Sequence, residues 1–112
     1  MSADFADDAA FRLAVGDLLK RLLRQIDDLD TDAVEARLTE GNLQLTFEED
    51  GSVFVLSQQT PTHELWLSAN RRAWHFQRVA GAWVERDSRE PMAPLLSGLI
   101  AARAHTPVRL TL

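Results

Sequence analysis

The sequence predicts an α+β two-layer sandwich, in which two helices pack on one face of an antiparallel sheet of about six strands. Three observations lead to this fold class. Apolar residues recur with helical spacing before Asp32, alternate with polar residues over much of the chain after it, and regain helical spacing near the C-terminus. Two helices are too few to cover both faces of such a sheet, so we expect them on one face and water on the other.

The first helix is expected at about residues 4–26. Its apolar positions follow one another at steps of three or four, which places them on a single buried stripe. The opposite face carries acid-first pairs four residues apart, Asp8 with Arg12 and Asp17 with Arg21, which favour ion pairs along the helix. The apolar stripe consists of Phe11, Val15, Leu18, Leu22, Ile26 and Leu29.

Strands are expected from Val34 onward, because the apolar period changes there from the helical value to two. Glu40-Gly-Asn and Asp50-Gly-Ser supply the turn residues that hairpins need. The expected strands occupy residues 34–38, 43–47, 53–55, 63–69, 73–79 and 82–85.

The second helix is expected after Asp87-Ser88 and extends to about Ala104. Pro91 and Pro94 are typical of a helix entry, since proline is tolerated in the first turn. Residues 108–112 form a short tail that closes the chain.

Trp66 is placed by the alternation of its strand. Leu65 and Leu67 share one face, whereas Glu64 and Trp66 share the other. If the leucines point toward the helices, Trp66 stands on the open face. Two interpretations remain for it there: a contact residue for a partner, or a surface aromatic that packs flat among neighbouring strand side chains.

Composition narrows the class of protein. The chain has 112 residues, so we expect a single domain over residues 1–112, large enough to bury a core without a disulfide or a structural metal. It contains no cysteine, which excludes disulfides, thiolate metal sites and a cysteine nucleophile. No stretch is long and apolar enough for a membrane span, and the N-terminal segment is acidic rather than basic. We therefore expect a cytoplasmic protein with no membrane partner.

Negative charge is concentrated in one segment. The whole chain has a formal net charge of −5, but residues 27–50 hold nine acids against Arg37 alone, a net charge of −8. Such a field argues against nucleic acid and favours cations or a basic protein surface as partner. No phosphate-binding loop, nucleophile elbow or histidine metal motif is present.

Five of these acids directly follow the first helix, where its dipole is negative and each nearby anion costs about 0.3–1 kcal/mol at low salt. They form either a solvated polar turn or an oxygen-only site that binds hard cations weakly, such as ferric iron, calcium, magnesium or manganese. The five acids are Asp27, Asp28, Asp30, Asp32 and Glu35.

The sequence resembles the bacterial frataxins, the CyaY-type proteins, from about Phe11 to the C-terminus. The most specific part is the run from Gln59 through Pro61 to Trp66-Leu67, at its spacing from the acidic strand pair. The other matching segments are the helix ending in Asp27-Asp28-Leu29-Asp30-Thr31-Asp32, the strands 43–48 and 51–55, Trp74-His75-Phe76 and Trp83.

The resemblance implies a non-enzymatic, iron-binding regulator or iron donor in iron–sulfur cluster assembly, which contacts cysteine desulfurase and its scaffold protein. It implies weakly bound ferrous or ferric iron on Asp27, Asp28, Asp30, Asp32, Glu35 and Asp8. It implies partner contacts through Asp28, Asp30, Asp32, Gln59, Pro61 and Trp66. The chain departs from the family pattern at Leu23, Arg24, Arg37, Ser57, where Asn is common, and Glu64, where Gln is usual.

Two other functions stay open. One is a ferroxidase that detoxifies iron by oxidising it on the acidic surface; the lack of His/Glu di-iron spacing argues against it. The other is a plain interaction module that uses the open sheet face and carries its acids for solubility. We expect a monomer and leave open whether iron drives oligomerisation.

Overall fold

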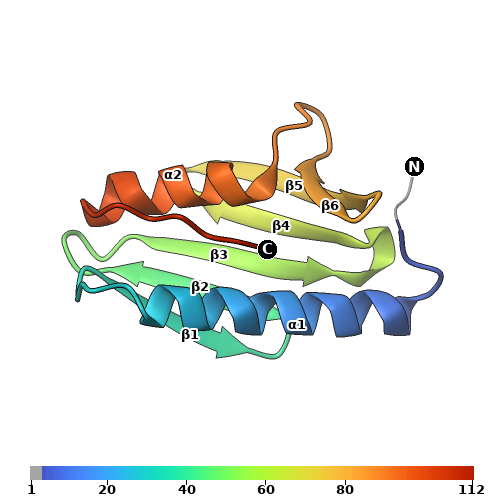
Figure 1. Cartoon of the computed structure of the whole chain (residues 1–112), viewed down its shortest axis with the longest axis horizontal. Helices are drawn as coiled ribbons and strands as arrows, with labels where there is room; N and C mark the ends of the chain where they lie inside the picture. Colours follow the sequence, from blue (N-terminus) through green and yellow to red (C-terminus); the bar gives the residue numbers. More distant parts are fainter. Residues whose placement is uncertain (1–3) are drawn as a thin grey trace.

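The computed structural model describes residues 4–112, which form a helix, a six-stranded sheet and a second helix in chain order. Figure 1 shows how these elements are arranged. All strands are antiparallel and each pairs with its sequence neighbours, in the order β1-β2-β3-β4-β5-β6. The elements are α1 (Asp8–Asp27), β1 (Val34–Thr39), β2 (Asn42–Phe47), β3 (Val53–Gln59), the 3-10 turn η1 (Thr60–Thr62), β4 (Glu64–Ala69), β5 (Arg72–Val79), β6 (Ala82–Glu85) and α2 (Met92–Ala104).

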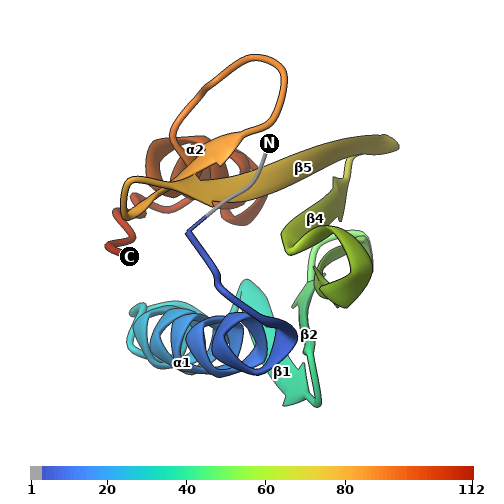
Figure 2. The same cartoon turned by 90° about the vertical axis from the view of Figure 1, so that its right-hand side faces the viewer.

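Both helices lie on the same face of the sheet, as the two perpendicular views show (Figures 1 and 2). The stripe predicted for α1 is buried except for Leu29, which lies beyond the end of the helix and is only partly buried. Alternate residues of each strand are buried or partly buried in the same core, and Leu96 and Ile100 of α2 are buried there too. The predicted fold class is therefore confirmed.

Neither helix within residues 4–112 is long and apolar enough to cross a bilayer. Residues 1–3 of the expected domain lie outside the described residues.

The first helix begins later than expected, at Asp8 instead of residue 4. Its N-cap is Asp7, whose carboxylate accepts a hydrogen bond of 2.8 Å from the Ala10 N–H. Asp4 instead accepts hydrogen bonds from the backbone N–H groups of Ala80 and Gly81 at 2.9 and 2.7 Å. This long-range contact, which periodicity cannot indicate, holds the segment before α1 against the β5–β6 turn.

The two faces of the sheet separate as the alternation predicted. In β4, Leu65, Leu67 and Ala69 are buried beneath the helices. Trp66 points to the other side and keeps 37% of its surface exposed. The orientation predicted for Trp66 is therefore confirmed, while its role remains a prediction.

The C-terminal tail lies between the two helices (Figure 1). Gln25 of α1 donates to the Thr111 carbonyl and accepts from the Thr111 N–H, both at 2.8 Å. On the other side, the Leu110 N–H donates to Ser97 Oγ of α2 at 2.9 Å, and the Leu110 side chain is buried. The tail is thus held by a side chain of each helix, Gln25 of α1 and Ser97 of α2.

Candidate functional site: an acidic ridge and a tryptophan cluster

The acidic ridge comprises Asp27, Asp28, Asp30, Asp32 and Glu35, where α1 ends and β1 begins. Asp28 caps the helix with its N–H, which donates to the Arg24 carbonyl at 3.0 Å. The Thr31 hydroxyl then accepts from the Ala33 N–H at 3.1 Å and closes the turn. All five acids are exposed, and none forms an ion pair with any residue of 4–112. Their charge is therefore available to an outside partner.

The β1–β2 hairpin extends the ridge with an acid that sequence reasoning did not select. Glu48 lies opposite Ala33, whose carbonyl accepts the Glu48 N–H at 2.9 Å. Asp32, Glu35 and Glu48 consequently line one shallow hollow with Thr46. The strand register could have indicated Glu48 from the sequence. A turn at Glu40-Gly41 pairs Glu35 with Thr46, and this register brings Glu48 to the ridge.

The ridge has the chemistry of a weak and open cation surface. Within residues 4–112, no three acidic or histidine side chains are placed to hold one ion together. Carboxylate oxygens suit hard cations, and ligands that remain in water bind them loosely and exchange them readily. An ion on this surface would keep most of its hydration water.

Asp8 does not join the ridge. It lies in the first turn of α1, and a helix of 20 residues separates it from Asp27 by about 30 Å. The expected ion pair with Arg12 is also replaced, because η1 brings His63 to the helix and sets its Nε2 2.8 Å from Asp8 Oδ1. The His63 ring in turn stacks on Phe11, with centroids 4.9 Å apart and planes at 16°.

Two acids at the end of the negative segment have partners in α2 and in the residue after it. Arg103 Nη1 lies 2.7 Å from Asp50 Oδ2, and His105 Nε2 lies 2.8 Å from Glu49 Oε2. Arg103 is thus beside the acidic segment in space, although far from it in sequence. Among residues 27–50, the acids without a basic partner in residues 4–112 are therefore the five ridge acids, Glu40 and Glu48.

The residues predicted for partner contact on the sheet are brought together in part. Gln59 and Trp66 share the open face of the β3–β4 pair, where Ser57 lies opposite Trp66 and Gln59 opposite Glu64. Pro61 lies in η1, which connects the two strands, and is exposed.

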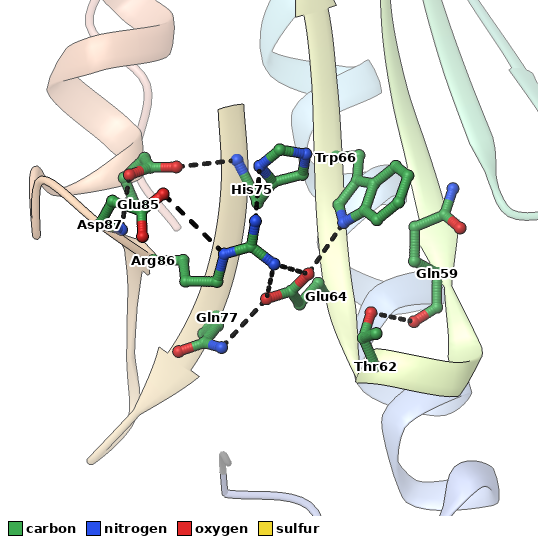
Figure 3. Close-up of polar contacts among 9 residues, drawn as sticks. All are labelled: Gln59, Thr62, Glu64, Trp66, His75, Gln77, Glu85, Arg86 and Asp87. Atoms are coloured by element: carbon green, nitrogen blue, oxygen red, sulfur yellow. Dashed lines mark hydrogen bonds and ion pairs between the residues drawn. The ribbon is translucent and has the colours of Figure 1, made fainter. Parts of the chain in front are cut away.

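Around Trp66 the open face holds a set of polar contacts that we call the tryptophan cluster (Figure 3). Its centre is the carboxylate of Glu64, which accepts from Trp66 Nε1 at 2.9 Å and from Gln77 Nε2 at 3.0 Å. Arg86 Nη1 lies 3.3 Å from Glu64 Oε1, and Arg86 Nη2 lies 3.3 Å from His75 Nδ1. The cluster consists of Glu64, Trp66, His75, Gln77 and Arg86.

The cluster stabilises Glu64 as an anion. Burial raises the pKa of the Glu64 carboxyl, but the hydrogen bonds from Trp66 and Gln77 and the positive charge of Arg86 outweigh it and lower the pKa below its ordinary value. Sequence reasoning placed Glu64 on the open face and noted it as a departure from the family pattern, but it did not select Glu64 as a site residue. Its partner Arg86 lies in the loop after β6, so no local pattern joins the two.

Glu85 is a second buried acid beside the cluster, and it supports the loop that carries Arg86. Burial raises the pKa of Glu85, but donation from the backbone N–H groups of His75, Ser88 and Asp87 lowers it to about 2. The contacts to His75, Asp87 and Ser88 measure 3.0, 2.7 and 2.9 Å. The 85–88 turn is therefore held by a buried carboxylate.

The family model of the frataxin-like domain matches residues 4–106. The chain belongs to the frataxin-like family. A curated protein of Ralstonia nicotianae, named iron-sulfur cluster assembly protein CyaY, is 34% identical over 97 residues, which cover 86% of this chain and 83% of that protein. A protein of the same name from Tolumonas auensis is 27% identical over 103 residues, which cover 92% of this chain and 97% of that protein.

Solved frataxin structures share the fold. The frataxin of Psychromonas ingrahamii superposes with a TM-score of 0.87 at 22% identity and covers 95% of this chain and 99% of its own. A trimeric frataxin of Saccharomyces cerevisiae gives a TM-score of 0.70 at 20% identity, with 95% and 87% covered. At these identities the likeness supports the two-layer architecture and the placement of its elements.

Proposed function

We propose that this frataxin-like protein acts in iron–sulfur cluster assembly as a non-catalytic regulator or iron donor. In this proposal the acidic ridge binds ferrous or ferric iron as cargo and docks on a basic surface of cysteine desulfurase. The observation that carries it is the ridge itself: a family member keeps five carboxylates, close together in sequence, exposed and without a cationic partner among residues 4–112. The names of its curated relatives support the pathway.

The tryptophan cluster supports a second contact, with the scaffold protein. Trp66 is a large exposed aromatic on the face that no helix covers, and exposed Trp residues often anchor protein interfaces. Gln59 on the neighbouring strand offers amide groups beside it. In this proposal the ridge provides long-range attraction to a basic protein, and Trp66 provides short-range packing on a second one.

Iron on the ridge modifies the docking, because both use the same carboxylates. A bound cation lowers the negative potential that a basic surface would meet, so iron availability would adjust the contact with the desulfurase. A ferroxidase centre, in contrast, uses Glu and His ligands that project into one protein interior. The ridge acids project into water, and no observation favours oxidation there.

A titration of the anaerobic protein with ferrous iron, followed by NMR, tests the cargo part of the proposal. We expect paramagnetic broadening of the amides of residues 27–35 and 48 first, and no accelerated oxidation when oxygen is admitted. The Asp17→Asn variant is the matched control, because it removes an exposed acid from the middle of α1 and should leave the broadening unchanged. Broadening centred elsewhere, or catalysed oxidation, would contradict the proposal.

A further inference from the structure

Glu64 is a buried charge on the side of the sheet that faces water. Only 1% of its surface is exposed, although its neighbour Trp66 on the same face keeps 37% exposed. A carboxylate on a solvated sheet face would ordinarily extend into water. Burial of an ionised group is unfavourable unless it is paired and fully hydrogen-bonded, so this arrangement needs compensation from its surroundings.

The compensation comes from three side chains that use both carboxylate oxygens. Oε1 accepts from Trp66 Nε1 at 2.9 Å and Oε2 from Gln77 Nε2 at 3.0 Å. Arg86 Nη1 donates to both oxygens, at 3.3 and 3.4 Å, and covers the carboxylate from the β6 side. Figure 3 shows these groups converging on Glu64 from β4, β5 and the segment after β6.

This arrangement holds the indole of Trp66 in one orientation. Its only hydrogen-bond donor is engaged by Glu64, and the His75 ring contacts it edge-on, with centroids 4.8 Å apart and planes at 79°. The polar edge is therefore directed toward the protein. What remains for a partner is ring surface, which suits an apolar or cationic side chain better than a hydrogen-bond acceptor.

We infer that Glu64, secured by Arg86, is a positioning residue that fixes the Trp66 indole before a partner docks on the sheet. The inference rests on the proposed contact through Trp66. A side chain that is already ordered loses less freedom on binding, which corresponds to about a 2- to 12-fold gain in affinity for one large side chain. Glutamine at this position would retain an acceptor oxygen for the indole N–H.

Three variants test the role in the full-length protein. Glu64→Ala removes the acceptor, Glu64→Gln keeps an acceptor but removes the charge, and Arg86→Gln removes the covering cation. Asp87→Asn is the matched control, because Asp87 is an exposed acid whose carboxylate lies 4.0 Å from Arg86 Nε and does not contact Trp66. Arg86 is 41% exposed at its side chain and can turn to water when Glu64 is absent, so the Ala variant should still fold.

The first readout is the indole N–H resonance of Trp66 in the free protein, assigned with Trp66→Phe, together with acrylamide quenching of its fluorescence. We expect Glu64→Ala to shift the resonance and increase quenching, Arg86→Gln to do so less, and Glu64→Gln to restore much of the wild-type signal. Asp87→Asn should change neither. An unmoved indole resonance in Glu64→Ala overturns the positioning role, and if that variant does not fold, an unmoved resonance in Arg86→Gln does so.

The second readout is affinity for the complex of cysteine desulfurase and scaffold protein. We expect Glu64→Ala to bind about 2- to 12-fold more weakly. The main cause should be slower association, because fewer free molecules hold the Trp66 indole in the orientation that binds. Glu64→Gln should recover most of the lost affinity. A displaced indole with unchanged affinity would instead overturn the proposed partner contact of Trp66. The two failures are thus distinguishable, since the first is measured without any partner.

Discussion

The acidic ridge and the tryptophan cluster both place carboxylates at the molecular surface, but they treat negative charge in opposite ways. On the ridge, five acids are exposed and have no cationic partner among residues 4–112. In the cluster, Glu64 is buried and meets Arg86, Trp66 and Gln77. In the proposed function the ridge therefore acts through its field at a distance, whereas the cluster acts through the shape and orientation of one aromatic ring.

If both proposed contacts are made, one small domain presents two binding surfaces that depend on different physical interactions. Exposed opposite charges attract one another over about one Debye length, which is about 8–10 Å near physiological salt. At larger separations the dissolved ions screen the attraction. Packing against Trp66 requires contact and depends little on salt. Changes on one surface should therefore leave the other unaffected, and each prediction below tests that separation.

The largest effect is expected from charge reversal on the ridge. Changing Asp28, Asp30 and Asp32 together to Lys should abolish binding to cysteine desulfurase, and wild-type binding should weaken steeply with salt because the attraction is long-range. Affinity measurements at low and high salt check this. The matched control is Arg109→Glu; Arg103 is unsuitable because it pairs with Asp50. An affinity that does not depend on salt would refute ridge docking.

A smaller loss is expected from Trp66→Ala. Partner affinity on the sheet face should fall about tenfold or more, because interface Trp residues are frequent hot spots. Stability should fall by clearly less than the roughly 3–5 kcal/mol typical of a buried Trp, since 37% of Trp66 is exposed. Chemical denaturation and binding measurements on the same variant check both. Trp83→Ala is the comparison, because Trp83 is buried; this variant should lose more stability than Trp66→Ala.

Lowering the pH should destabilise the protein by protonating two buried carboxylates, Glu85 and Glu64. Glu85 has its pKa lowered to about 2 from an ordinary value of 4.5, so its contribution is present above pH 4.5 and is lost as the pH falls from 4.5 toward 2. Allowing for solvent screening, this amounts to roughly 2 kcal/mol. The lowered pKa of Glu64 acts in the same direction. Glu85→Gln should be less stable at neutral pH and should lose less stability on acidification.

The smallest effect is expected from neutralisation of the ridge. Changing Asp27, Asp28, Asp30 and Asp32 to Asn should raise the melting temperature in the absence of metal by a few degrees, since about 1 kcal/mol corresponds to 4–8 °C in a domain of this size. Calcium or ferrous iron should stabilise the wild type and have little effect on the variant. A variant that melts lower and still responds fully would place the cation site elsewhere.

Much of the fold follows from local patterns in the chain. Helical spacing from Phe11 to Ile26 and the alternation of Leu65 and Leu67 each concern neighbours within a few residues, and both gave the correct buried face. The hairpin turns at Gly41 and Gly51, where φ is 76° and 71°, fix the strand register and carry Glu48 to the ridge. The ridge acids could be selected because they are adjacent in sequence.

Contacts between distant segments are what the tertiary structure alone decided. Arg86 contacts Glu64 across 22 positions of the sequence, Arg103 contacts Asp50 across 53, and His63, not Arg12, contacts Asp8 across 55. Each depends on how β-strands, turns and helices stack, which the period of apolar residues does not encode. The sequence by itself therefore determined which apolar residues face the core and where negative charge accumulates. Only the folded chain decided which charges are neutralised, because pairing requires side chains to lie within a few ångströms of each other.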